Sequence, residues 1–203
     1  MIELSKKIST IVGKTNAEYG LIKEGDRVLV GFSGGKDSLT LLHALNRIKK
    51  VAPFNFDFKA ITVTYGMGEQ VQFLSKHCAE HGIEHEIIDT QIFELAGEKI
   101  RKNSSFCSFF SRMRRGYIYT VAQEQGYNKI ALGHHLDDAM ESFFMNFFYN
   151  GTMRTMPPKY TAENGLEVIR PLIFCRERQL RAFADTNEIN VIGDEACPGL
   201  RFD

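Results

Sequence analysis

The chain has 203 residues, 43% of them hydrophobic and 25% charged, with 25 Lys and Arg balancing 25 Asp and Glu. This length and composition support a substantial core, which excludes a disordered chain, a collagen and a disulfide-stapled miniprotein. No apolar run approaches the roughly 20 residues of a membrane span, and the first residues lack the apolar stretch of a secretory signal. We therefore expect a single cytoplasmic domain over residues 1–203 that has no membrane partner.

Hydrophobic periodicity predicts strands that alternate with helices along the chain. Residues 1–20 predict an amphipathic N-terminal helix that ends near Gly20. Strands are predicted at 27–32, 58–64, 84–89, 129–133 and 167–173, and further helices at 38–50, 69–82, 111–125, 136–149 and 176–187. Helices of this length between strands indicate right-handed crossovers. The predicted fold class is therefore α/β, a doubly wound parallel sheet of about five strands with helices on both faces.

Two later segments are interpreted from composition. Residues 150–166 contain two glycines, two prolines and two asparagines, which predicts a surface loop before the last strand. The preceding helix carries Phe143, Phe144, Phe147 and Phe148, and we expect these rings to pack in the core rather than to stack on nucleic-acid bases.

Positive charge is concentrated between Lys99 and Gly116, which contain six basic residues and no acidic one. This segment carries +6, so the rest of the chain carries −6. Such a block suits a polyanionic partner, although a solvated helix face is the alternative. We expect Arg112, Arg114 and Arg115 to meet RNA phosphates.

The most informative segment, Ser33-Gly34-Gly35-Lys36-Asp37-Ser38, directly follows the first predicted strand. It lacks the glycine and the Ser or Thr that a Walker A loop requires at the corresponding positions. Glycines, hydroxyls, a lysine and a helix N-terminus still make a site suited to phosphate. The alternative is a tight turn in which Asp37 complements the helix dipole and Ser38 lies near the cap.

The SGGKDS string resembles that of the PP-loop ATP pyrophosphatases, whose fold is adenine nucleotide alpha hydrolase-like. Gly133-His134-His135-Leu136-Asp137-Asp138 is similar to the GHxxDD signature of the branch that modifies tRNA. Residues 107–116, 146–158 and 169–177 are similar to the tRNA 2-thiocytidine synthetases, and the resemblance covers roughly residues 15–198. It implies an ATP-dependent enzyme that adenylates a pyrimidine base of tRNA, in an anticodon loop, for sulfur transfer, releasing AMP and pyrophosphate.

The resemblance also implies roles for single residues. Ser33 to Ser38 would bind ATP phosphates with Gly133, His134 and Asp137, and Lys36 would neutralise pyrophosphate. Mg²⁺ would be held by Asp37 and Asp138. His134 would lie near the α phosphate. The alternative interpretation is that Asp137 and Asp138 merely cap the following helix.

The family's iron-sulfur cluster requires three cysteines, of which Cys107 and Cys197 match the first and third. The second position is Phe110, which leaves the cluster doubtful, and Cys175 is a conceivable substitute. Cys107 and Cys197 are in any case the expected sulfur-transfer residues. The implied partners are tRNA and a persulfide or sulfide donor such as a cysteine desulfurase, and a homodimer is left open.

Two other functions stay open. A ligase similar to tRNA lysidine synthetase would share the phosphate loop, the name used below for Ser33 to Ser38, but would need a C-terminal substrate domain. A nucleotide-binding module that lacks thiolation would bind ATP without releasing pyrophosphate. Because relatives continue beyond the position of Asp203, we expect either a short member or a trimmed C-terminus.

Overall fold

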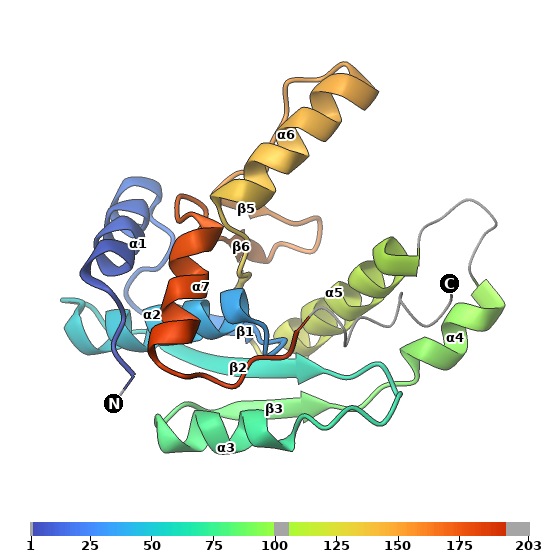
Figure 1. Ribbon diagram of the computed structural model, residues 1–203, viewed down its shortest axis with the longest axis horizontal. Helices are drawn as coiled ribbons and strands as arrows, with labels where there is room; N and C mark the ends of the chain where they lie inside the picture. The colour runs from blue at the N-terminus through green and yellow to red at the C-terminus, as the bar shows by residue number, and fades with distance from the viewer. Residues whose placement is uncertain (1, 100–105, 194–203) are drawn as a thin grey trace.

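Figure 1 shows the computed structural model, which describes residues 2–99 and 106–193. Its sheet has six strands in the order β3-β2-β1-β4-β6-β5. The strands are β1 (Arg27–Gly31), β2 (Asp57–Val63), β3 (His85–Ile88), β4 (Lys129–Ala131), β5 (Lys159–Thr161) and β6 (Glu167–Ile169). The helices are α1 (Lys6–Tyr19), α2 (Lys36–Val51), α3 (Gln72–Glu80), α4 (Ile92–Lys99), α5 (Phe106–Glu124), α6 (Leu136–Asn150) and α7 (Glu177–Thr186).

Side chains that alternate along the strands build a core on each face of the sheet. Val28 and Val30 of β1 belong to the core that α1, α2, α3 and α7 cover. Leu29, between them, belongs to the second core, which is covered mainly by α5. Strands buried on both faces explain why β1 reads as a continuous apolar run rather than as an alternating pattern.

The predicted α/β class, the doubly wound parallel sheet of about five strands and the helices on both faces are confirmed, and the sheet has one further strand. All five predicted strands exist, and four of their pairings are parallel. The sixth strand, β5, lies inside the segment predicted as a loop and pairs antiparallel to β6. A strand of three residues, with two prolines directly before it and a glycine shortly after it, shows no detectable period of two, so its pairing to β6 defines it. Helix α4 was also missed.

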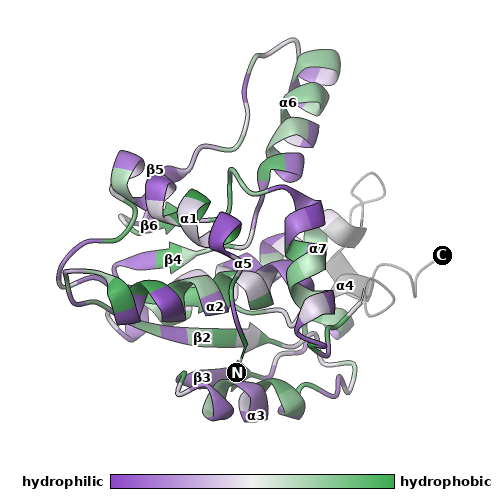
Figure 2. Ribbon diagram, turned by 60° about the vertical axis from the view of Figure 1, so that its left-hand side comes forward, coloured by the Kyte–Doolittle hydropathy of each residue, from purple (hydrophilic) through white to green (hydrophobic). Residues whose placement is uncertain are grey.

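Helix α6 projects away from the body of the molecule (Figure 1), and Figure 2 shows hydrophobic residues along the projecting part. Ala139 is its only buried residue, whereas Phe144, Phe147 and Phe148 are exposed. The prediction that these rings pack in the core was therefore wrong. The local pattern is that of a buried helix, but the sheet ends before it can cover this one. In residues 2–99 and 106–193, no helix is both long and apolar enough for a bilayer crossing.

Candidate active site

The strand order reverses direction between β1 and β4, which are parallel neighbours. In open α/β sheets ligands bind at such a switch point, beyond the carboxyl ends of the strands. The phosphate loop follows β1 there, and Gly133 to Asp138 follow β4. A methyl group on Gly133 would lie 3.2 Å from the backbone nitrogen of Ser38 and from the carbonyl carbon of Asp37. Glycine at this position therefore lets the end of β4 approach the first turn of α2.

Hydroxyl groups brace the phosphate loop from within. Oγ of Ser38 accepts hydrogen bonds from the N–H and the hydroxyl of Ser33, both at 3.2 Å, and donates to the Gly35 carbonyl at 3.0 Å. Gly34 has a φ of 81°, a left-handed conformation that favours glycine. Its carbonyl accepts the N–H of Ile192 at 2.9 Å, so the chain after α7 closes over the loop.

A cavity of about 580 Å³ opens between these loops and α5. Its size lies in the range of small-ligand sites. The wall contains polar residues from the two loops, apolar residues from β2 and α5, and the turn after β2. They include Ser33, Asp37, Ser38, Gly133, His134 and Asp138, together with Ile61, Tyr65, Glu69, Arg114, Arg115 and Ile118. Gly34, Gly35, Lys36 and Asp137 lie beside this cavity without lining it.

Two carboxylates on the cavity wall are arranged around His135. Its Nε2 lies 3.8 Å from Oδ1 of Asp37, and its Nδ1 lies 3.5 Å from Oδ2 of Asp138. Oδ1 of Asp37 is buried without a hydrogen-bond partner, and burial raises the pKa of this carboxyl while Lys36 and His135 oppose the rise. A buried carboxylate oxygen without a donor suits a hard cation such as Mg²⁺, which is held by one or two carboxylates and substrate phosphates. The residues present therefore fit the implied ion.

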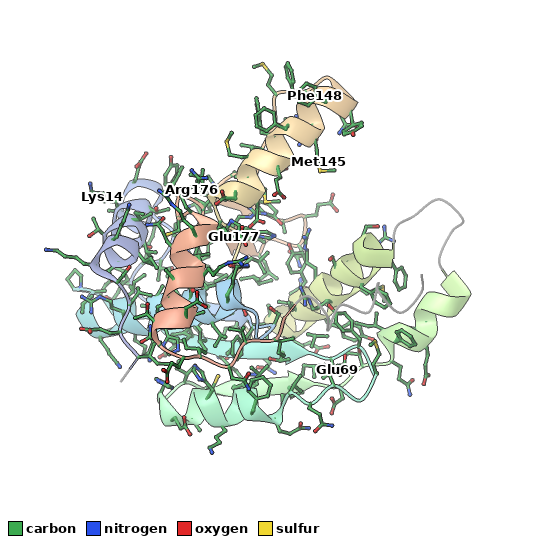
Figure 3. The ribbon with its side chains drawn as sticks, in the orientation of Figure 1. Lys14, Glu69, Met145, Phe148, Arg176 and Glu177 are labelled. Carbon is green, nitrogen blue, oxygen red and sulfur yellow. The ribbon has the colours of Figure 1, made fainter. Side chains whose placement is uncertain are left out.

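Asp138 also has the role that the alternative interpretation gave it. Its Oδ2 accepts the N–H of His135 at 2.8 Å and so caps α6. Asp137 has a different environment. It accepts the N–H of Glu177 at 2.7 Å and pairs with Arg176 at 3.0 Å, which ties α6 to α7. Figure 3 shows Arg176 and Glu177 where α7 approaches the base of α6.

His134 is held as a neutral imidazole. Burial, and then the charge of Arg170, lower the pKa of His134 to about 4. Nε of the buried Arg170 donates to Nδ1 of His134 at 3.2 Å, so the ring proton resides on Nε2. Arg170 is itself fixed by the Pro157 carbonyl at 2.8 Å and by the ring of Tyr160, 5.1 Å below its guanidinium. His134 is therefore a hydrogen-bond donor on the cavity wall.

Lys36 carries a positive charge at the mouth of the phosphate loop. Its Nζ lies 3.3 Å from Asp37 and 3.2 Å from Glu177. Partial burial lowers the pKa of Lys36, but the two carboxylates outweigh it and raise the pKa overall. Glu177 thus holds the ammonium group in place from the start of α7.

The arginines of the basic segment between Lys99 and Gly116 occupy two different environments in the structure. Arg114 and Arg115 line the cavity, and the guanidinium of Arg114 lies 5.9 Å from the centre of the Tyr65 ring. Arg112 is exposed and is not part of the cavity wall. Two of the three predicted RNA-contacting arginines therefore share one site with the phosphate loop.

The expected sulfur residues lie mostly outside the described structure. The side chain of Cys107 and all of Cys197 belong to the undescribed part, as do Lys99 to Lys102 of the basic block apart from the backbone of Lys99. Phe110 is buried against Tyr65 and Phe109 and offers no donor atom. Burial raises the pKa of Cys175 to about 12, so this core thiol is a poor cluster ligand. In the described residues, neither position completes the set of three thiolates.

Sequence reasoning assigned no role to Arg170, Glu177 or Glu69. Arg170 and Glu177 lie in segments that carried the family resemblance, but their partners are more than 30 residues away in the chain. Glu69 accepts the N–H groups of Tyr65 at 2.5 Å and Met67 at 2.9 Å and thereby shapes the turn that closes the cavity. An acidic residue in a glycine-containing turn was the only signal that could have indicated it.

Comparisons with known proteins agree with this geometry. A family model described as a PP-loop domain matches residues 3–203. A tRNA-cytidine(32) 2-sulfurtransferase of Geobacter metallireducens is 43% identical over 189 residues, which are 92% of this chain and 74% of that protein. The enzyme of the same name from Pseudomonas syringae is 41% identical over 96% of this chain and 72% of its own. Among solved structures, this chain is similar to the U34-tRNA thiolase NcsA from Methanococcus maripaludis, which is described with a 4Fe-4S cluster. The two superpose with a TM-score of 0.78 at 28% sequence identity. The superposition covers 96% of this chain and 67% of that one.

Proposed function

The chain belongs to the tRNA-cytidine(32) 2-sulfurtransferase family of PP-loop proteins, and from this premise we propose that it converts cytidine 32 of tRNA to 2-thiocytidine after adenylating the base. It is an enzyme of ATP-dependent tRNA thiolation. The observation that supports the proposed chemistry is the shared cavity. A phosphate loop, a neutral histidine donor and two arginines face one space of about 580 Å³.

We assign the phosphates of ATP to the loop between β1 and α2. The first N–H groups of a helix have no partner within the helix, so the start of α2 presents donors and the positive end of a dipole to an anion. Lys36, held by Glu177, adds a charge that stabilises pyrophosphate as it leaves. Mg²⁺ bound to Asp37 and Asp138 would supply further charge neutralisation at the phosphates.

His134 acts at the phosphorus that is attacked. Its Nε2–H can donate to an oxygen of the α phosphate, where negative charge grows during attack. Because the imidazole is neutral above pH of about 4, this donor is present throughout the physiological range. Arg170 is a positioning residue, since it fixes the ring and its tautomer without lining the cavity.

Adenylation has a clear chemical reason. The carbonyl oxygen of the cytosine ring is a poor leaving group, and its attack on the α phosphate turns it into part of AMP. We propose that Cys107 or Cys197 carries the sulfur as a persulfide, which a persulfide donor such as a cysteine desulfurase loads. The outer sulfur attacks the activated carbon as the carbon-oxygen bond to AMP breaks. The thiolate of the other cysteine then attacks the inner sulfur, which breaks the sulfur-sulfur bond, releases 2-thiocytidine and leaves a Cys107–Cys197 disulfide that an external thiol reduces. Among the described residues, Phe110 and Cys175 supply no third thiolate, while the side chain of Cys107 and all of Cys197 lie outside them, so the proposal includes no step on an iron-sulfur cluster.

Arg114 and Arg115 place the tRNA. They line the cavity that holds the phosphate loop, so a backbone phosphate on either residue brings the adjacent base to the reacting ATP. Phosphate contacts fix register and make affinity depend on salt, whereas the base is selected inside the cavity.

The experiment combines purified protein with tRNA, ATP, Mg²⁺ and free lysine, and supplies sulfur from a cysteine desulfurase with cysteine and a thiol reductant. It measures pyrophosphate release, and it measures 2-thiocytidine by mass spectrometry of digested tRNA. We expect tRNA-dependent pyrophosphate release and one 2-thiocytidine per tRNA. Pyrophosphate release that leads to a lysine adduct instead would support the ligase alternative. ATP binding without any pyrophosphate would support the binding module, and either result would overturn the proposal.

A charge-reversal pair tests the placement of tRNA. Arg114→Glu with Arg115→Glu should weaken tRNA binding by about 100-fold at moderate salt. The matched control reverses Arg47 and Lys50, two exposed residues in the last turns of α2, at the end remote from the phosphate loop. Equal tRNA affinity of the first pair and the parent would show that the basic block is only a solvated face.

A further inference from the structure

A row of hydrogen bonds runs from helix α3 to the residue that precedes the phosphate loop. Oγ of Ser75 in α3 lies 2.9 Å from Nδ1 of His85, the first residue of β3. Nε2 of the same ring lies 2.9 Å from Oγ1 of Thr62 in β2, and this hydroxyl donates to the Phe32 carbonyl at 2.7 Å. We call Ser75, His85 and Thr62 the threonine-histidine network. None of the three lies in the sequence motifs that indicated the site.

The donors and acceptors of this network follow from their chemistry. A carbonyl oxygen only accepts, so the single hydroxyl proton of Thr62 is committed to Phe32. Thr62 therefore accepts from His85, which places the ring proton on Nε2. Burial lowers the pKa of His85 to about 4, so the ring is neutral at physiological pH and its Nδ1 accepts the hydroxyl proton of Ser75. Every bond then points toward the Phe32 carbonyl, and bonds aligned in this way strengthen one another.

The register of the sheet puts these side chains on one face. In the parallel pairing of β2 with β3, His85 is the partner of Ala60. Side chains two residues apart on a strand share a face, so Thr62 lies on the same face as Ala60 and His85. The Phe32 ring contacts His85 on this face, edge to face, with ring centroids 5.5 Å apart. The edge strand β3 thereby reaches, across β2, the residue that follows the central strand β1.

The Phe32 carbonyl belongs to the peptide group through which the chain enters the phosphate loop. The same peptide group carries the N–H of Ser33, which donates to Oγ of Ser38 at 3.2 Å. Its two polar atoms are therefore held from opposite sides, by Thr62 from β2 and by Ser38 from α2. Because a peptide group is planar, fixing its carbonyl also fixes the direction of its N–H. Thr62 and Phe32 are buried on the cavity wall, so the entry into the loop is oriented from outside the loop.

We propose that Thr62 and His85 are positioning residues for ATP binding, which orient the Phe32–Ser33 peptide group so that the phosphate loop receives the triphosphate. This inference rests on the proposed assignment of the ATP phosphates to that loop. His85 and Ser75 do not line the cavity and act through Thr62. A misoriented loop weakens the binding of ATP and of the transition state alike, because it contacts the phosphates in both. The signature of this role is a raised KM for ATP at an unchanged kcat.

Valine tests the proposal because it has the shape of threonine without the hydroxyl. Thr62→Val leaves the Phe32 carbonyl and the His85 N–H without these partners, and we expect the KM for ATP and the dissociation constant from calorimetric titration to rise about 10-fold or more. The kcat of tRNA-dependent pyrophosphate release should change by less than about 3-fold. Thr62→Ser keeps the hydroxyl and should restore ATP affinity. The matched control is Thr15→Val in α1, a buried threonine outside the cavity wall whose hydroxyl donates to the Ile11 carbonyl at 2.9 Å.

The split between KM and kcat separates this role from a merely structural one. Both valine variants should lose stability in urea unfolding, but a smaller folded fraction only lowers the apparent kcat and leaves KM unchanged. Should Thr62→Val fold poorly, His85→Phe repeats the measurement at a half-buried position, and the KM for ATP should rise about 3-fold or more. His85→Gln should stay near the wild type, because its amide group can both donate and accept.

Four results would overturn the proposal. They are an ATP affinity of Thr62→Val within about 2-fold of the wild type, an equal loss in Thr15→Val, a loss confined to kcat, and a failure of Thr62→Ser to restore affinity. A wild-type protein that binds ATP without releasing pyrophosphate would overturn the proposed function instead, and the ATP affinities of the variants would still decide the positioning role. A wild-type protein that binds no ATP would overturn both.

Discussion

Gly34 allows the phosphate-site assignment to be tested by a single methyl group. Alanine at a φ of 81° costs about 1 to 2 kcal/mol, because its Cβ crowds the following carbonyl. The methyl group would also lie 2.7 Å from Cδ1 of Ile192 and 3.0 Å from Cδ2 of Leu74. Ile192 must move, which strains its N–H hydrogen bond to the Gly34 carbonyl, a bond worth about 1 kcal/mol. We expect Gly34→Ala to lower the free energy of unfolding by about 2 to 3 kcal/mol.

Gly82 provides the matched control. It has a φ of 67°, and a methyl group there would meet no atom within 4 Å. Gly82→Ala should therefore show the backbone cost alone, about 1 to 2 kcal/mol. Urea unfolding gives the stabilities, and calorimetric titration gives ATP affinity. A displaced loop loses one or two phosphate hydrogen bonds, so the dissociation constant for ATP should rise about 10- to 100-fold in Gly34→Ala only. Unchanged ATP affinity in Gly34→Ala, or an equal loss in Gly82→Ala, would refute the assignment.

Three further predictions follow from the site and the core. Burial, and then the charges of neighbouring groups, lower the pKa of His43 to about 3, so its neutral form is favoured in the folded state and stability falls as pH drops below the ordinary value of 6.5. Urea unfolding should show that the free energy of unfolding falls by about 2 kcal/mol between pH 6.5 and 5 because of His43. His43→Gln should remove this fall, and a variant with the same pH dependence as the wild type would contradict the prediction. Arg170→Met should raise the pKa of His134, because it removes the charge that lowers this pKa. The rate of pyrophosphate release should then fall on the acidic side in the variant, whereas the wild-type rate should not change near pH 6.5. Variant and wild-type pH profiles of the same shape would exclude the positioning role of Arg170. Cys107→Ser and Cys197→Ser should each abolish 2-thiocytidine while tRNA-dependent ATP cleavage continues, and thiolation that survives in both variants ends their sulfur role.

The fold was predictable because its signals are local. The apolar runs of β1, β2 and β4 and the helical periodicity between them identified the class and all five parallel strands. The antiparallel strand β5 was not predictable from its three residues, because it exists only through its pairing with β6. The prediction that the phenylalanines of residues 143–148 pack in the core was wrong for a related reason. Their composition is that of a buried helix, and nothing in a local pattern reveals that the sheet does not extend beneath them.

The site, like the fold, has features that local sequence indicates and features that depend on tertiary contacts. The sequence by itself identified two candidate segments, Ser33 to Ser38 and Gly133 to Asp138, because each combines glycine with side chains that can bind an anion or a cation directly after a predicted strand. It also determined that a basic segment accompanies them. Only the tertiary structure decided that Arg114 and Arg115 line the cavity while Arg112 does not, and that Asp137 is committed to α7. The same holds for Arg170 on His134 and Glu177 on Lys36. These pairs join residues 36 and 141 positions apart, and their meeting depends on the order of strands in the sheet, which no local spacing encodes.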